Sequence, residues 1–289
     1  MKQGDVMLLE NLRFHEEEEK GIPSFAADIA LMGDLYVDDA FGTAHRAHAS
    51  ITGVATYRPA VAGFLMEKEI DNLGGILESP ERPFFAVMGG AKISDKLAMV
   101  QNIMGKVDGV LVGGGMAATF LEAQKMEVGK SLVDEGIGEA ITRLLADIEK
   151  RKANLMLPVD VLVADKAEAG AKTQVVSVGK IPKDMMIVDI GPKTTANFIN
   201  ELKKCKTVFW NGPMGIYEVP AFAKGTKEIA STIAALKAKT VIGGGSTADM
   251  VMEMGLAEKM THVSTGGGAS LNFLGGEKLP GIQVLPDKK

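Results

Sequence analysis

The sequence predicts an α/β protein built around a parallel sheet, and three observations support this fold class. Short β-rich runs alternate with longer amphipathic stretches along almost the whole chain. Several of these runs are apolar without alternation, as expected of strands that helices cover on both faces. Glycine-rich turns follow four of the runs. Strand–helix alternation of this kind predicts βαβ units and a parallel sheet.

The predicted strands are short runs rich in apolar and β-branched residues. They cover residues 6–12, 34–40, 83–88, 109–113, 154–164, 185–190, 207–212, 240–244 and 261–266. Helix-like segments between them include 94–106, 135–151 and 224–239. Ser94 is the predicted N-cap of the first of these, because it precedes an apolar stripe with a period of 3.6 residues.

One long amphipathic segment at 63–83 breaks the alternation and ends at a proline. It predicts a helix that joins two lobes. The chain before it holds only two strand candidates, too few for an independent domain with covered faces.

The overall charge and composition are those of an ordinary globular protein that avoids nucleic acid and membranes. The net charge of −5 argues against a general surface for nucleic acid or anionic lipid. No apolar stretch approaches the roughly 18–20 residues of a membrane span. The single cysteine, Cys205, excludes an internal disulfide framework and fits a reducing, cytoplasmic compartment.

The glycine turns fall at regular distances along the chain. Gly89 and Gly113 are 24 residues apart, and Gly243 and Gly266 are 23 apart. Each interval suits one helix and one strand, so we expect the turns to share one edge of the sheet. That edge is the carboxyl end of the strands, where open α/β sheets bind ligands.

A glycine turn before a helix lets backbone amides approach an anion closely. Several such turns on one edge predict a pocket for a polyphosphate. The alternative is that the glycines only permit tight packing of helices on strands.

Two sequence motifs for phosphate ligands, the dinucleotide fingerprint and the P-loop, are incomplete in this chain. Residues 113–118 satisfy the pattern G-x-G-x-x-A, but no acidic residue ends a second strand about 20 positions later. Residues 129–131 read G-K-S, yet Gln124 stands where a P-loop needs its first glycine. A mononucleotide site without a P-loop is therefore predicted. Lys92 and Lys96, four residues apart at a helix start, suit phosphoryl transfer, which needs positioned positive charge.

Seven strings in the chain together resemble phosphoglycerate kinase, in that family's order. They are LLENLRFHEEEE, DDAFGTAHRAHAS, GGAKISDK, VGGGMAATF, WNGPMGIYE, IGGGST and VSTGGGASL. The resemblance spans nearly every residue from 6 to 286 and implies two Rossmann-like lobes with a hinge. It implies a glycolytic kinase that transfers a phosphoryl group between 1,3-bisphosphoglycerate and MgADP, giving 3-phosphoglycerate and MgATP.

The resemblance also implies the domains and the site residues. We expect the remnant of a phosphoglycerate-binding lobe at 1–60, an interlobe helix at 61–82, a nucleotide-binding lobe at 83–275 and a C-terminal return segment at 276–289. Arg13 and Arg46 are expected to bind phosphoglycerate through bidentate guanidinium groups. Lys92, Gly267 and Gly268 are the expected catalytic residues. The expected nucleotide-binding residues are Lys92, Lys96, Gly113, Gly114, Asn211, Glu218, Gly244, Gly245, Ser246 and Thr247.

Two histidines beside Arg46 have a spacing that suggests metal ligands. No cysteine or further histidine supports a metal site at His45 and His48, so that interpretation is rejected.

The chain departs from the family's pattern at one metal contact. Ser246 stands where the family has an aspartate that contacts Mg²⁺, a cation that prefers carboxylate oxygen. Either Ser246 holds the metal through water, or Asp249 compensates, or nucleotide affinity falls. Of these, a water bridge is favoured over Asp249.

A second departure concerns the start of the chain. The family carries about a hundred further residues upstream, roughly a small domain, which include a catalytic arginine. We therefore expect a fragment that binds nucleotide and turns over little, because losing such a charge costs about 10³–10⁵ in rate.

The alternative function is a non-catalytic nucleotide-binding module that acts through partners, and a dehydrogenase is a distant third. The expected state is a monomer that binds small molecules, although an unfinished sheet could pair with a second copy.

Overall fold

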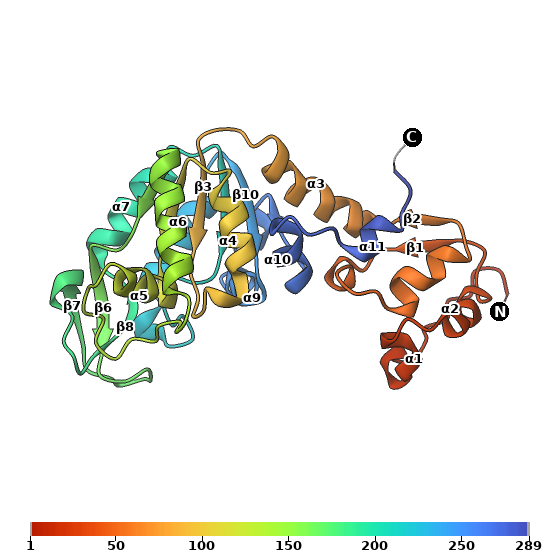
Figure 1. The fold of residues 1–289 in the computed structure, drawn as a ribbon, viewed down its shortest axis with the longest axis horizontal. Helices are drawn as coiled ribbons and strands as arrows, with labels where there is room; N and C mark the ends of the chain where they lie inside the picture. The colour runs from red at the N-terminus through yellow and green to blue at the C-terminus, as the bar shows by residue number, and fades with distance from the viewer. Residues whose placement is uncertain (1, 288–289) are drawn as a thin grey trace. The chain divides into compact units, whose positions relative to one another are not determined.

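The computed structural model describes residues 2–287 and divides them into two compact units. One unit comprises residues 2–70 together with 277–287, and the other comprises 71–276. The division falls within helix α3 (Phe64–Glu78), in the segment where a helix between lobes is predicted. Figure 1 labels the elements of both units.

The larger unit contains a six-stranded sheet in which every neighbouring pair of strands is parallel. Its strands, in spatial order, are β5 (Asn154–Met156), β4 (Gly109–Val112), β3 (Phe84–Met88), β9 (Thr207–Asn211), β10 (Lys239–Gly243) and β11 (His262–Val263). Numbered along the chain, this is the order 3-2-1-4-5-6 of a Rossmann fold, which reverses between β3 and β9. The predicted parallel α/β sheet is confirmed.

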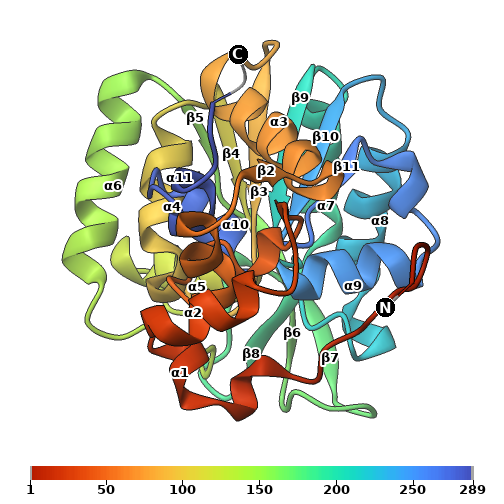
Figure 2. The ribbon, with the colours of Figure 1, turned by 90° about the vertical axis from the view of Figure 1, so that its right-hand side faces the viewer.

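Helices connect these strands and cover the sheet. They are α4 (Leu97–Met104), α5 (Gly114–Ala123), α6 (Gly138–Arg151), α7 (Pro192–Leu202), α8 (Lys224–Ala234), α9 (Gly245–Glu253) and α10 (Gly268–Leu274). Figure 2 shows α4 and α6 to one side of the strands and α8 to the other. All residues of β3, β4 and β9 are buried, which explains why β3, β4 and the middle of β9 are apolar without alternation.

The packing on one face of the sheet shows how the strand period places the core. Phe85 and Val87 of β3 and Trp210 of β9 belong to one apolar cluster. Side chains of α7, α8 and α9 complete it, among them Phe198 and Ile229. Because successive strand residues point to opposite faces, Ala86 and Met88 face the helices on the other side.

A second sheet of three strands is antiparallel, which the sequence patterns do not predict. Its order is β7 (Thr173–Ser177), β6 (Asp160–Ala164) and β8 (Met186–Ile190). The single strand predicted at 154–164 is wrong, because it divides into β5 and β6, which belong to different sheets. Pro158 lies in the break and cannot donate to a strand ladder. Strand β7 is missed because its residues are mostly exposed and polar.

The smaller unit is built from short elements. They are α1 (Glu16–Glu19), α2 (Pro23–Ala30), β1 (Tyr36–Asp38), β2 (Ala60–Ala62), α11 (Pro280–Gln283), and single helical turns at Leu12–Phe14, Phe41–Thr43, Ala49–Gly53 and Val54–Thr56. Strands β1 and β2 form a parallel pair. The strand predicted at 6–12 is wrong: Val6 and Leu8 are 96% and 95% exposed, so they have no core to pack against.

The N-terminus of α4 corrects another expectation. A 3₁₀ turn at Ser94–Lys96 precedes α4, and the Ser94 side chain caps neither element. The amides of Ile93 and Ser94 donate instead to Asp134 Oδ2, at 2.9 and 2.7 Å. The cap therefore comes from a carboxylate about 40 residues away, which a local sequence pattern does not reveal.

Two further structural facts bear on the sequence-based expectations. Cys205 is buried and free. Within residues 2–287, no helix combines the length and the apolar character that crossing a bilayer requires.

Candidate functional site

All four glycine-rich turns lie at the carboxyl edge of the six-stranded sheet. They follow β3, β4, β10 and β11, which run in the same direction. The shared edge predicted from the spacing of the glycines is confirmed. A fifth turn, after β9, begins at Gly212 and lies next to the turn after β3, where the strand order reverses. Open α/β sheets bind ligands at this switch point.

The glycines of these turns serve two different purposes. A Cβ on Gly114, where φ is +60°, would lie 2.7 Å from the Gly90 nitrogen and 2.8 Å from the Pro213 oxygen. Such glycines allow neighbouring turns to pack backbone against backbone, as the tight-packing alternative requires. Around Gly245 and Gly267, however, a Cβ would meet no atom within 4 Å. Packing does not explain glycine at these two positions, where the backbone borders open space.

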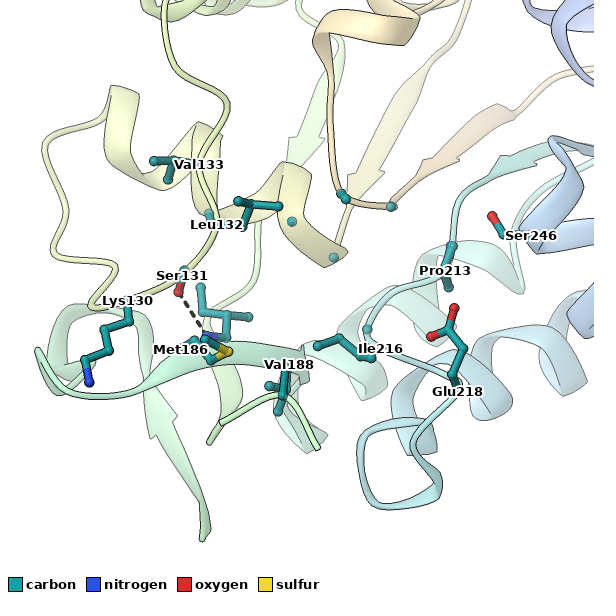
Figure 3. A pocket seen from close by; sticks show the side chains of 18 of the residues that line it. Lys130, Ser131, Leu132, Val133, Met186, Val188, Pro213, Ile216, Glu218 and Ser246 are labelled. Carbon is teal, nitrogen blue, oxygen red and sulfur yellow. Dashed lines mark hydrogen bonds between the residues drawn. The ribbon is translucent and has the colours of Figure 1, made fainter. Parts of the chain in front are cut away.

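A cavity of about 670 Å³ opens beside the switch point, and we call it the rim cavity. One wall is apolar and comes from the loop after α5 and from β8; Figure 3 shows Leu132, Val133 and Met186 there. The opposite wall carries Pro213, Glu218 and Ser246 (Figure 3). The other residues that line the rim cavity are Gly90, Ala91, Gly114, Gly115, Ala118, Lys130, Ser131, Glu135, Ala167, Ile187, Val188, Gly215 and Ile216. A concave site with apolar walls and a few polar groups suits a small organic ligand with a flat apolar part.

The start of α9 presents unused backbone amides at the same edge. The first bond within this helix runs from the Ala248 amide to the Gly244 oxygen, at 3.0 Å. The amides of Gly245, Ser246 and Thr247 therefore have no carbonyl partner within the helix. Gly244 has a φ of +86°, a backbone conformation that residues with a side chain rarely adopt. This geometry favours an anion at the turn.

Two polar side chains lie beneath this turn. Thr247 is fully buried, and its hydroxyl accepts a hydrogen bond of 2.7 Å from the Gly212 amide. Asn211 is also fully buried, but neither its Nδ2 nor its Oδ1 has a hydrogen-bond partner within the described residues. A Cβ on Gly244 would lie 2.7 Å from Asn211 Nδ2. An unpaired buried amide is costly, so the Asn211 amide is available to a ligand group or to a water molecule.

The two lysines differ in their surroundings. Lys96 is half-buried, and a Cβ on Gly90 would lie 3.3 Å from its Nζ, so its ammonium group lies at the turn after β3. Burial lowers the pKa of Lys96, while the nearby Asp95 carboxylate raises it. Lys92 is exposed on the loop before the 3₁₀ turn. A partly desolvated ammonium group acts more strongly on a neighbouring anion than one in bulk water.

Some of the other predicted residues at this edge line the rim cavity and some do not. Gly114 lines it, whereas Gly113 is buried and packs against Met214. Gly267 and Gly268 follow β11 at the same edge but are not among the residues that line the cavity. Figure 3 shows the exposed Glu218 side chain pointing toward Pro213, on the side of Ser246.

Residues 129–131 do not form a P-loop. The Lys130 amide donates to the Met185 oxygen at 2.8 Å, and the Ser131 hydroxyl accepts from the Ile187 amide at 2.9 Å. These bonds tie the segment to the edge of β8 (Figure 3). Lys130 and Ser131 therefore line the rim cavity rather than forming a strand-to-helix phosphate loop.

In the smaller unit, Arg13 lines a cavity of about 240 Å³ together with Glu18, Thr43, His48 and Ser50, among others. Glu18 is almost fully buried and accepts from the Ser50 amide and hydroxyl, at 2.9 and 2.6 Å. His48 Nδ1 lies 3.6 Å from the same carboxylate.

His45 has both predicted arginines among the charged groups around it. Burial lowers the pKa of His45 first, and the charges of Arg46, His48 and Arg13 lower it further. Arg46 itself is exposed. A cluster of this kind suits a small anion that bears phosphate or carboxylate groups.

Sequence patterns missed the apolar wall of the rim cavity and the residues that hold its loop. Leu132 and Val133 come from a segment without regular structure, and Met186 comes from a strand of the second sheet. Asp134 also lies in that segment, and it accepts from amides of residues 92–96, which we call the lysine loop because they include Lys92 and Lys96. The pattern S-L-V-D-E carries no periodic signal, so only the fold reveals these residues.

Comparison with known proteins agrees with this fold. The family described as phosphoglycerate kinase matches residues 1–277. Phosphoglycerate kinase of Pelotomaculum thermopropionicum is 54% identical, with 100% of this chain and 73% of that protein covered. The corresponding protein of Dictyoglomus turgidum is 52% identical over the same shares.

Solved structures agree as well. Phosphoglycerate kinase from Coxiella burnetii superimposes with a TM-score of 0.90 at 40% identity, covering 95% of this chain and 71% of the other. The Pyrococcus horikoshii enzyme gives 0.84 at 33% identity, with 99% and 73% covered. The likeness extends over the whole chain in both sequence and fold. This chain belongs to the phosphoglycerate kinase family.

Proposed function

We propose that this chain acts as a kinase on 1,3-bisphosphoglycerate and ADP, giving 3-phosphoglycerate and ATP in glycolysis. The observation that carries the proposal is the row of open backbone amides beside the rim cavity, in a chain that belongs to this family. Family membership does not favour the alternative of a non-catalytic module that acts through partners.

The nucleotide is proposed to lie with its base in the rim cavity. The apolar wall at Leu132 and Val133 suits the faces of a base, and the backbone of Gly114 lines the same cavity. Gly113 packs against Met214 and is proposed to support the side of the cavity that Gly114 lines. Glu218 is proposed to accept hydrogen bonds from the ribose hydroxyls, because its carboxylate borders the cavity near Ser246.

The phosphates are proposed to extend along the turn before α9. The amides of Gly245, Ser246 and Thr247 would donate to phosphate oxygens, with Gly244 permitting the close approach. Asn211 would donate from its unpaired Nδ2 beside Gly244. The Thr247 hydroxyl accepts from the Gly212 amide, which leaves its own hydrogen to donate, so Thr247 can offer both its amide and its hydroxyl.

Catalysis of the transfer is proposed to rest on fixed positive charge. In the direction of ATP synthesis, a β-phosphate oxygen of ADP attacks the acyl phosphate and the phosphorus–acyl oxygen bond breaks. The carboxylate of 3-phosphoglycerate leaves with the bonding electrons. Lys92, Lys96 and the amides at Gly267 and Gly268 would stabilise the charge on the moving group. Arg13 and Arg46 are proposed to bind the phosphate of phosphoglycerate.

Magnesium is proposed to enter as part of the substrate MgADP, where it neutralises phosphate charge. Ser246 lies in the first turn of α9 and is exposed, and Asp249 is exposed one turn later. Among residues 2–287, no three histidine, cysteine or acidic side chains form a group that could hold a metal ion. A serine hydroxyl fits Mg²⁺ that keeps most of its water ligands, so we propose that Ser246 contacts the ion through water.

The chain is further proposed to be a cytoplasmic monomer that acts on small molecules. Its single cysteine is buried as a free thiol, which fits a reducing compartment. Sedimentation at several protein concentrations would test the oligomeric state. A mass that rises with concentration would contradict it.

Titration calorimetry with ADP and with NADH tests the proposed ligand, and a coupled assay of ATP formation tests the reaction. We expect ADP to bind and NADH to compete poorly, because no acidic residue ends a second strand about 20 positions after the glycine motif at 113–118. Variants Lys96→Ala and Arg13→Ala should lower turnover through different substrates, the first through ADP and the second through the bisphosphoglycerate. Absence of ADP binding by the folded chain would overturn the proposal.

A further inference from the structure

The loop that lines the apolar wall of the rim cavity also holds the lysine loop. Leu132, Val133 and Glu135 line the cavity. Asp134, which lies among them, makes its bonds elsewhere: its Oδ2 accepts from the amides of Ile93 and Ser94, at 2.9 and 2.7 Å. The segment 131–135 therefore lines the cavity and also binds the backbone that leads into Lys96.

The position of Asp134 is itself determined by the helix at the cavity's other wall. Its amide donates to Thr119 Oγ1 at 3.1 Å. Thr119 is buried on α5, and its hydroxyl donates to the Gly115 oxygen at 3.4 Å. Gly115 lines the rim cavity. A chain of hydrogen bonds thus runs from the cavity wall through Thr119 and Asp134 to the lysine loop.

The charge of Asp134 suits this role. Hydrogen bonding from the Ser94 amide is the first cause that lowers the pKa of Asp134, and the Lys92 charge contributes to the same direction. Asp134 therefore remains ionised at neutral pH. Its carboxylate is an acceptor for the first amides of a helical segment, where a negative charge is favourable.

We propose that Asp134 is a positioning residue that couples filling of the rim cavity by a nucleoside to placement of Lys92 and Lys96. The inference rests on the proposed function, because it takes the cavity as the base site and the lysines as phosphate contacts. A base against Leu132 and Val133 orders the loop, and Asp134 passes that order to the segment 92–96. Loss of the Asp134 carboxylate should then weaken contacts to phosphate while leaving contacts to the base.

Ligands with and without phosphates separate these two sets of contacts. We expect Asp134→Ala to bind ADP about tenfold more weakly than the unaltered chain, which corresponds to about 1.4 kcal/mol. The affinity for adenosine should change less than about twofold on the same scale. Asp134→Asn keeps an oxygen acceptor and should recover most of the ADP affinity. Asp147→Ala, which removes an exposed carboxylate from α6, is the matched control and should change neither affinity.

Hydrogen exchange on the unaltered chain tests the coupling without relying on a variant. Adenosine should slow exchange of the Ile93 and Ser94 amides, although it has no phosphate to reach the lysines. The same protection should be missing in Asp134→Ala. Trp210, which is fully buried and the only tryptophan, reports by fluorescence whether each variant is folded.

The outcomes are distinct. If the unaltered chain binds neither ADP nor adenosine, the proposed function is wrong. If it binds both, but Asp134→Ala keeps the ratio of the two affinities, Asp134 has only a structural role and the inference is overturned. If Asp134→Ala unfolds, the exchange experiment and Asp134→Asn decide, and unchanged exchange of Ile93 with adenosine overturns the inference.

Discussion

The substitution Gly245→Ala distinguishes access for phosphate from close packing of turns. Gly245 is the first residue of α9, is exposed, and has no atom within 4 Å of the position that a Cβ would occupy. The alanine methyl group would thus leave the folded chain undisturbed. It would stand beside the unused amides at the start of α9, where we propose that phosphate oxygens bind.

The expected magnitudes follow from these surroundings. Alanine is favoured over glycine by up to about 1 kcal/mol within a helix, so the free energy of unfolding should stay constant or rise slightly. A hydrogen bond to a charged group contributes about 1.5–3 kcal/mol. Losing one such bond to phosphate should weaken ADP binding by about 10- to 100-fold. Stability and affinity should therefore move in opposite directions.

The assay combines urea unfolding, followed by Trp210 fluorescence, with calorimetric titration of ADP. Gly138→Ala is the matched control, because Gly138 also begins a helix, α6, and a Cβ there would meet no atom within 4 Å. It should reproduce the effect on stability without the effect on affinity. Wild-type ADP affinity in a folded Gly245→Ala variant would refute the reasoning.

Three further substitutions have definite expected outcomes. Gly114→Ala should lower the free energy of unfolding by about 2–5 kcal/mol in urea titrations. Gly114 has a positive φ, and a Cβ at this position would lie less than 3 Å from backbone atoms. A loss of less than about 0.5 kcal/mol would contradict the packing role. Burial raises the pKa of Asp189 to about 7, above its ordinary value of 3.8, so folding favours the protonated form and stability falls as pH rises between these values. Asp189→Asn should flatten that part of the pH dependence of urea unfolding, and an unchanged slope between pH 4 and 7 would argue against the raised pKa. Ser246→Asp should increase the Mg²⁺ dependence of ADP affinity in calorimetry, whereas an unchanged dependence would mean that a carboxylate at this position is dispensable.

The parallel sheet and its functional edge were predictable from sequence because buried strands have a strong local signal. The runs that became β3 and β4 are apolar throughout, β9 is apolar between Thr207 and Asn211, and all their residues are buried. The glycine spacing then requires only that each βα unit returns to the same edge. The turns that hold Gly89 and Gly113, and those that hold Gly243 and Gly266, share one edge of the sheet, as their spacing predicts.

What sequence patterns did not reveal depends on contacts between distant segments. Asp134 caps a helical turn about 40 residues away, while the local pattern favours Ser94. The Thr247 hydroxyl accepts a hydrogen bond from the Gly212 amide, which lies 35 residues earlier in the chain. The run at 6–12 has the composition of a strand, but Val6 and Leu8 lack neighbours to bury them. In each case tertiary contacts decide what the local pattern leaves open.

Open amides along one edge of the sheet are proposed to hold the phosphates of a nucleotide. Amide NMR shifts measured with ADP and with adenosine test it most directly. We predict that ADP shifts the amide signals of residues 244–247 strongly and adenosine does not, while both ligands shift those of Leu132 and Val133. Equal shifts at 244–247 with both ligands, or none with ADP, would contradict the account.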